Sequence, residues 1–155
     1  CSSDLVPVVG RPAEMGHERR EEERRVGHAA GDDDVHIGLQ RGHDVYIANA
    51  VKCRPPNNRT PEADELAACF PYLRRQIELI QPRLIVALGR PAAQAMLNQE
   101  VKISAARGKT FRYGDIPVVV TYHPAYLLRN QPDKAKAWED LCFARKTMRA
   151  LRDEA

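Results

Sequence analysis

The chain has 155 residues, of which 43% are hydrophobic, and a formal net charge of +3. This length suits one globular domain with a core, and no apolar run reaches the roughly 20 residues of a membrane span. No signal peptide opens the chain, so we expect a soluble protein. Its four cysteines lack the regular spacing of a disulfide framework, which favours the reducing cytoplasm.

Charge is distributed unevenly along the chain. Residues 1–43 carry a net charge of −3 and residues 44–155 a net charge of +6, which suits a polyanionic partner. Residues 1–36 contain long charge runs and no sustained apolar period. We interpret them either as a disordered arm or as non-native sequence, such as a frameshift or a chimeric join before Ile37. The folded domain is then residues 37–155.

Regular patterns follow from Ile37 onward. Short apolar runs at 45–51, 84–88 and 116–122 predict strands. A helix is expected from an N-cap at Thr60 to about residue 80, a short helix over 91–97, irregular chain over 99–115, and a last helix from Asp133. The apolar stripes expected to face the core are Leu66, Phe70, Leu73, Ile77 and Ile80 in the first helix and Trp138, Leu141, Cys142, Met148 and Leu151 in the last.

Strands separated by helices favour parallel pairing with right-handed crossovers. The expected fold is therefore an α/β class, three-layer α/β/α sandwich with a small parallel sheet. Three strands make an incomplete sheet of this kind. We therefore expect that an N-terminal strand has been lost.

Polar residues stand where two of these strands end, Asn49 in one case and His123 in the other. Ligands of open α/β sheets bind at the carboxyl ends of the strands, so the two residues are expected to face one pocket from neighbouring strands. An amide offers both an acceptor and donors, and an imidazole can donate to a developing anion. The residues alone also allow a capping asparagine and an ordinary core or solvated histidine.

Two longer motifs narrow these alternatives. The runs NAVKCRPP at residues 49–56 and HPAYLLR at 123–129, together with Cys69, resemble family 4 uracil-DNA glycosylases, and the resemblance extends from about Ile37 to the C-terminus. It implies an enzyme of base excision repair that hydrolyses the N-glycosidic bond of a uracil flipped out of DNA. Asn49 would then read the edge of uracil, and the catalytic His123 would stabilise the departing base.

The resemblance also implies a DNA-binding surface. Leu127 and Leu128 are expected in an exposed loop, where they can insert into the base stack; the alternative is that they pack beneath the loop. Arg54, Arg129 and the Arg-Gly-Lys segment with Arg107 and Lys109 are candidate phosphate contacts.

The resemblance further implies a [4Fe–4S] cluster held by four cysteines. Cys53 and Cys69 match two of these ligands in motif and spacing. The C-x-x-C pair that supplies the other two does not occur in this sequence, so occupancy of the cluster is doubtful and the site is half built. The alternative is that both residues are reduced thiols of the core.

A second family motif is missing from this sequence. The Gly-Glu-x-Pro-Gly loop that positions the attacking water does not occur in residues 1–43. Two functions remain open: a uracil-DNA glycosylase, impaired in this copy, or a non-catalytic DNA-binding module, that is, an inactive fragment with the same fold. In either case the expected partner is uracil-containing DNA, the expected state a monomer, and no membrane is involved.

Overall fold

The computed structural model describes residues 5–9, 45–53 and 55–153. The described strands are β1 (Leu5–Val9), β2 (Val45–Asn49), β3 (Leu84–Leu88), β4 (Thr110–Tyr113) and β5 (Ile116–Thr121). The described α-helices are α1 (Ala63–Ile80), α2 (Arg90–Leu97), α3 (Ile103–Ala106), α4 (Pro124–Arg129) and α5 (Lys134–Asp153). Short 3-10 helices are η3 (Pro56–Asn58) and η4 (Gln131–Asp133).

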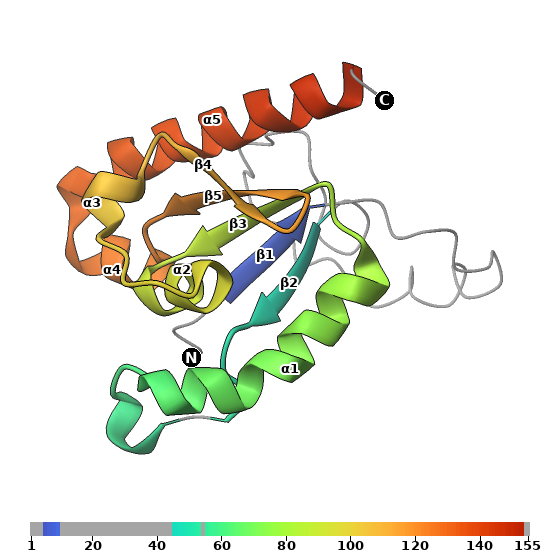
Figure 1. Ribbon diagram of the computed structural model, residues 1–155. Helices are drawn as coiled ribbons and strands as arrows, with labels where there is room; N and C mark the ends of the chain where they lie inside the picture. Colours follow the sequence, from blue (N-terminus) through green and yellow to red (C-terminus); the bar gives the residue numbers. More distant parts are fainter. Residues whose placement is uncertain (1–4, 10–44, 54, 154–155) are drawn as a thin grey trace, which may run out of the picture.

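The described strands form one sheet in the order β2-β1-β3-β5-β4 (Figure 1). Strand β1 is antiparallel to both β2 and β3, whereas β3 and β5 are parallel and β4 is antiparallel to β5. Strands β2, β3 and β5 therefore run in the same direction. Their carboxyl ends lie at one edge of the sheet, which the site occupies.

The three strands expected from sequence all form, but the expected parallel sheet is wrong. The sheet is mixed because β1 lies antiparallel between β2 and β3 and because β4 and β5 form a hairpin. Two residues join the hairpin strands, and the first, Gly114, has φ of +57°. Such a short connection permits only antiparallel pairing. The segment 99–115, expected to be irregular, contains α3 and β4.

Strand β1 lies within the segment interpreted as an arm. Its five residues pair with β2 over Leu5–Val9 and with β3 at Val8 and Val9. For these residues the expectations of disorder and of a lost strand are wrong, because a strand occupies an inner position of the sheet. Residues 10–44, with the suggested join before Ile37, lie outside the described part of the chain.

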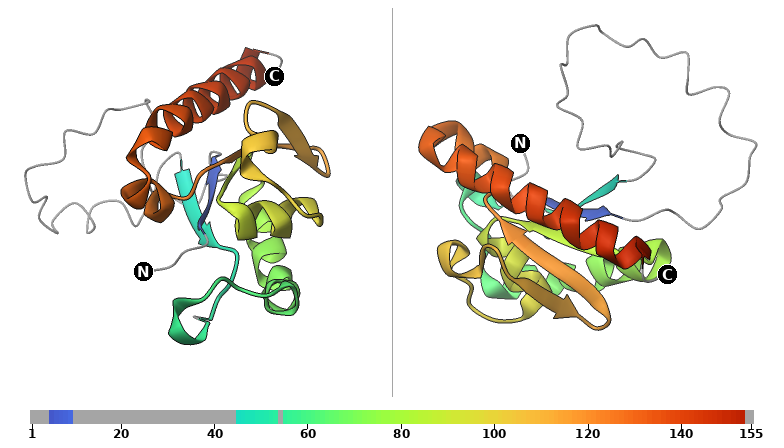
Figure 2. Two further views of the ribbon diagram at one scale, coloured as in Figure 1. Left: turned by 90° about the vertical axis from the view of Figure 1, so that its left-hand side faces the viewer. Right: turned by 90° about the horizontal axis from the view of Figure 1, so that it is seen from above.

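The three-layer α/β/α arrangement is confirmed. Helices α1 and α2 cover one face of the sheet and α5 runs along the other (Figures 1 and 2). Side chains alternate between the faces of a strand: in β3, Ile85 and Ala87 join the core beneath α1 and α2, whereas Leu84 and Val86 join the core beneath α5. Of the described helices, none has the length and apolarity to cross a membrane.

Helix α1 begins three residues after the expected N-cap at Thr60. The N-cap is Glu62, whose backbone N–H donates to the carboxylate of Glu65 over 2.9 Å in a capping box. The expected apolar stripe is confirmed, because its members at Leu66 and Leu73 are buried and Phe70 packs partly against the same core.

The buried face of α5 matches the expected one only in part, with Met148 buried as expected. The fully buried residues are Ala137, Asp140, Ala144 and Met148, whereas Trp138 is 46% exposed. Small side chains let the helix approach β5 closely, and the largest side chain lies outside that contact. The carboxylate on this face has partners that lie far away in the sequence, as described below.

Candidate functional site

The site lies at the edge of the sheet where β2, β3 and β5 end (Figure 1). Asn49 is the last residue of β2, Gly89 directly follows β3, and His123 comes two residues after β5. Both polar residues expected from sequence are thus at the edge where ligands of open α/β sheets bind.

The two strands that carry Asn49 and His123 are not neighbours, which corrects the sequence expectation. Strands β1 and β3 lie between β2 and β5. At about 4.8 Å per strand, the backbones at the two positions are separated by about 14 Å. A ligand that touches both side chains must therefore lie across the ends of the inner strands, next to Gly89.

His123 is held in a defined protonation state by its own loop. It is the N-cap of α4, and its Nδ1 accepts a hydrogen bond from the backbone N–H of Ala125 over 3.0 Å. A neutral imidazole has one acceptor nitrogen and one donor nitrogen, so the proton resides on Nε2. That Nε2 is buried and has no hydrogen-bond partner among the described residues. Leaving a buried donor unpaired costs about 1–3 kcal/mol, and a ligand oxygen would recover this.

The neutral form of His123 is also favoured electrostatically. Burial lowers the pKa of His123, and the positive charge of Arg129 lowers it further. Both effects disfavour the imidazolium ion. At neutral pH the side chain is therefore a neutral N–H donor.

Gly89 contacts the histidine from the end of β3. Its φ of +89° lies in a region that L side chains rarely adopt, and a Cβ at this position would lie 3.0 Å from the Cβ of His123. Its backbone N–H donates to the carbonyl of Thr121 over 2.8 Å. Glycine therefore allows the turns after β3 and β5 to pack directly against each other.

Asn49 is half-buried, and a network fixes the turn that follows it. The ammonium group of Lys52 donates to the backbone carbonyl of Asn49 over 2.9 Å and to the side-chain oxygen of Gln76 over 2.6 Å. Gln76 in turn donates to the hydroxyl of Tyr46 over 3.0 Å. Within the described residues, no hydrogen bond engages the side-chain amide of Asn49, which leaves it available to a ligand.

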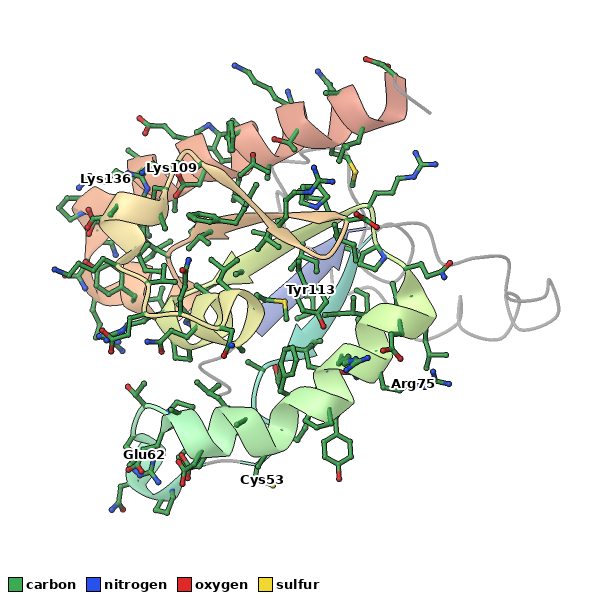
Figure 3. All side chains as sticks on the ribbon, in the orientation of Figure 1. Cys53, Glu62, Arg75, Lys109, Tyr113 and Lys136 are labelled. Atoms are coloured by element: carbon green, nitrogen blue, oxygen red, sulfur yellow. The ribbon has the colours of Figure 1, made fainter. Side chains whose placement is uncertain are left out.

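A contact between a backbone amide and a thiol brings the segment of Cys53 close to Cys69 on α1. The backbone N–H of Lys52, the residue before Cys53, lies 3.4 Å from Sγ of Cys69. Cys53 is exposed beside α1, as Figure 3 shows, and Cys69 is half-buried. No group of three potential metal ligands occurs among the described residues. Because a [4Fe–4S] cluster needs four ligands, the described residues alone do not fit it.

The two leucines of the second motif lie on a short helix, not in the expected loop. Helix α4 begins directly after His123, with Pro124 at its first position. Leu128 is 71% exposed, whereas Leu127 is half-buried. Leu128 is therefore the residue of this pair that is free to enter a base stack, because Leu127 is less exposed.

The candidate phosphate contacts differ in availability. The side chains of Lys109 and Arg129 are exposed, and Lys109 lies just before β4 in Figure 3. Arg107 is instead directed inward, where its Nε lies 2.8 Å from the carboxylate of Asp140. We therefore infer internal support, not phosphate contact, for Arg107. Arg54 lies outside the described residues.

Sequence reasoning missed three residues that shape the site: Gly89, Thr121 and Asp140. The signal for Asp140 was a carboxylate among small and apolar residues on one face of the last helix. Such a position predicts a buried charge that must be paired. Its partners could not be identified, because they are distant in the sequence.

The fold is thus an α/β sandwich, and its polar site residues lie at the carboxyl edge of the sheet. Known proteins are similar to this sequence as follows. The family model of the uracil DNA glycosylase superfamily matches residues 16–142. The chain therefore belongs to the uracil DNA glycosylase superfamily. The match begins at residue 16. The sequence resemblance was expected to start later, at about Ile37.

Three individual relatives show the extent of the similarity. The type-4 uracil-DNA glycosylase of Saccharolobus solfataricus is 47% identical over 123 residues, which are 74% of this chain and 55% of that protein. The type-4 enzyme of Thermotoga maritima is 48% identical over 101 residues, 64% of this chain and 52% of that protein. The type-5 uracil-DNA glycosylase of Pyrobaculum aerophilum is 42% identical over 89 residues, 54% of this chain and 37% of that protein. The chain spans about half the length of these type-4 relatives.

Proposed function

We propose that this chain is a uracil-DNA glycosylase that hydrolyses the N-glycosidic bond of a uracil flipped out of DNA. Family membership supports the reaction class. The observation that carries the proposal is the buried Nε2–H of His123 at the carboxyl edge of the sheet, which has no hydrogen-bond partner among the described residues. The names of the type-4 relatives point to the same reaction.

His123 has the state that this chemistry requires. Hydrolysis breaks the bond between C1′ of the sugar and N1 of the base, and the electron pair leaves with the base. The water oxygen bonds to C1′ and its proton ends on the base. Negative charge develops on the oxygens of the departing uracil, and a neutral Nε2–H can donate to O2. A preorganised donor of this kind typically contributes about 10²–10³ in rate.

Asn49 is the proposed reader of the base. Uracil presents an N3–H donor beside an O4 acceptor, and a carboxamide complements both. Cytosine reverses both polarities. The amide of Asn49, which has no hydrogen bond within the described part of the chain and lies on a turn fixed by Lys52, supports this role. We assign no side chain among the described residues to activate the attacking water.

The proposed DNA-binding surface lies around α4. Leu128 would fill the space of the extruded base, and Arg129 and Lys109 would contact phosphates. Their exposure supports this. Arg54 follows Cys53 directly in the sequence and remains a proposed contact.

A single-turnover assay on an oligonucleotide with one uracil tests the reaction. His123→Ala should slow uracil release by about 10²–10³-fold, while binding to the DNA changes much less because phosphate contacts dominate affinity. Thr147→Val is the matched control, since in the described part of the chain the Thr147 hydroxyl donates to the carbonyl of Phe143 in its own helix. If the parent chain binds uracil-containing DNA but releases no uracil, it is a DNA-binding module and the proposal fails.

We also propose Cys53 and Cys69 as two ligands of a [4Fe–4S] cluster, supported by the contact between Sγ of Cys69 on α1 and the backbone N–H of Lys52, the residue before Cys53. Iron and acid-labile sulfide in the purified chain should be low and easily lost, because two ligands are missing from the described residues. Cys53→Ser and Cys69→Ser should each abolish the remainder, and Cys142→Ser should not. Equal iron in all four proteins would mean that the two cysteines are ordinary thiols.

We propose further that the chain acts as a monomer in the cytoplasm. Free thiols at Cys53, Cys69 and Cys142 suit a reducing compartment. Light scattering on the purified chain tests the oligomeric state, and a mass near 17.5 kDa is expected.

A further inference from the structure

Asp140 is a buried acid that the proposed reaction does not use. It is 2% exposed, as is Thr121, and these are the buried polar residues of the described chain. The hydroxyl of Thr121 donates to Oδ2 of Asp140 over 2.6 Å, and Nε of Arg107 donates to the same oxygen over 2.8 Å. One carboxylate of α5 thus joins the end of β5 to the segment that follows α3.

Arg107 is tied to this place by further contacts. Its guanidinium donates to the backbone carbonyl of Lys136 over 2.6 Å and lies 3.3 Å from the carboxylate of Glu139. It also lies over the ring of Tyr122, with its central carbon 5.5 Å from the ring centroid. Tyr122 is the residue directly before His123.

Tyr126, on α4, is held by contacts of both its ring and its hydroxyl. The rings of Tyr122 and Tyr126 stack with centroids 5.2 Å apart, and the hydroxyl of Tyr126 donates to Asp133 over 2.7 Å. Thr121 also accepts from the backbone N–H of Gly89 over 2.8 Å. The two residues before His123 are therefore both linked to Asp140, Thr121 directly and Tyr122 through Arg107.

We propose that Asp140 is a positioning residue for His123: through Thr121 and Arg107 it fixes the turn that holds the imidazole at the N-terminus of α4. The consequence for catalysis rests on the proposed function. The consequence for the geometry of His123 does not.

A purely stabilising role explains the arrangement less well. A buried ion pair contributes little net stability, and replacing one with apolar groups of similar shape is often neutral or favourable. A shared carboxylate fixes the orientation of its neighbours, because two donors must converge on one oxygen. A fixed orientation is what His123 requires, since it has a single N–H to offer a ligand.

Thr121→Val tests this in the full chain, because it removes the hydroxyl and keeps the shape. Hydrogen exchange at the amide of Ala125, which donates to Nδ1 of His123, reports the position of the imidazole. We expect this exchange to accelerate about tenfold relative to core amides such as Val119, as for one lost hydrogen bond to a charged group. Thr121→Ser, which keeps the hydroxyl, should restore the parent value, and Asp140→Asn should behave like Thr121→Val.

Single-turnover uracil release gives a second readout. In Thr121→Val the rate should fall about tenfold with unchanged affinity for DNA, whereas the control Thr147→Val should change neither. Exchange at Ala125 that accelerates only as much as at Val119, or that Thr121→Ser fails to restore, would overturn the positioning role. If the parent chain releases no uracil, the proposed function fails, but the exchange measurement still decides the role of Asp140.

Discussion

The Cβ of His123 lies 3.0 Å from the point where a Cβ on Gly89 would stand. The turn after β3 therefore packs directly against His123 and limits the positions that the histidine can take. Nothing larger than hydrogen fits between the two turns without displacing one of them.

Gly89→Ala should consequently lower both stability and activity. The strained φ and the close contact should together reduce the free energy of unfolding by about 1–3 kcal/mol, measured by urea denaturation. Gly114→Ala is the matched control, because Gly114 also has positive φ, of +57°, but no atom lies near its Cβ position. Equal losses in the two variants would show that backbone strain alone acts at Gly89.

Features of the site that depend on nearby residues in the sequence could be predicted, whereas those that depend on distant residues could not. Asn49 and His123 were predicted because each stands at the end of a local apolar run. Helix α4 was missed, although Pro124 in its first position is a local signal for a helix start. The expectation of an exposed loop that inserts leucines into DNA was preferred over this proline signal.

Features that rest on distant partners could not be predicted. Asp140 is buried because Arg107, 33 residues earlier, meets it, and no local pattern encodes that pairing. The buried face of α5 was predicted correctly at Met148 but not at Asp140, since an acid on a helix ordinarily indicates the solvent side. The order of the sheet likewise depends on β1, which precedes its partner β2 by about 40 residues and was read as part of an arm.

Acid should destabilise the chain partly through His123. Its folded pKa is lowered, first by burial and then by Arg129, whereas the unfolded value is about 6.5. As pH falls below about 6.5, the unfolded chain takes up this proton first, so stability decreases until the folded pKa is passed. Urea denaturation at about pH 7.5 and about pH 5.5, on either side of that value, should show a larger loss for the parent than for His123→Gln.

The other histidines are present in both proteins, so their contributions cancel in that comparison. An equal loss in the parent and in His123→Gln would mean that the folded and unfolded pKa values of His123 do not differ.

Leu128→Ala should separate DNA distortion from folding. The side chain is 71% exposed, so the free energy of unfolding should change by less than about 0.5 kcal/mol. Loss of the apolar wedge should reduce base flipping, seen as a smaller fluorescence rise from 2-aminopurine placed beside the uracil. Leu79→Ala is the control, since Leu79 is 65% exposed on α1. A matching fluorescence change in both variants would exclude a specific wedge at Leu128.

Asn49→Asp should weaken discrimination between uracil and cytosine. The carboxylate keeps the acceptor for uracil N3–H but replaces the donor to O4 with a second acceptor, which instead suits the amino group of cytosine. One mismatched hydrogen bond should lower the ratio of uracil to cytosine release by at least about tenfold. Single-turnover assays on oligonucleotides that differ only in the target base measure this ratio.

Asn98→Asp controls for the added charge in that experiment. Asn98 is exposed at the far end of α2 from Gly89, about 14 Å along the helix at 1.5 Å per residue, so its substitution should leave the ratio unchanged. The comparison is informative because Lys52 holds the backbone carbonyl of Asn49 and not its side chain, so the turn should survive the substitution. An unaltered ratio in Asn49→Asp would remove Asn49 from base recognition and leave His123 as the sole residue of the pair with a role in the reaction.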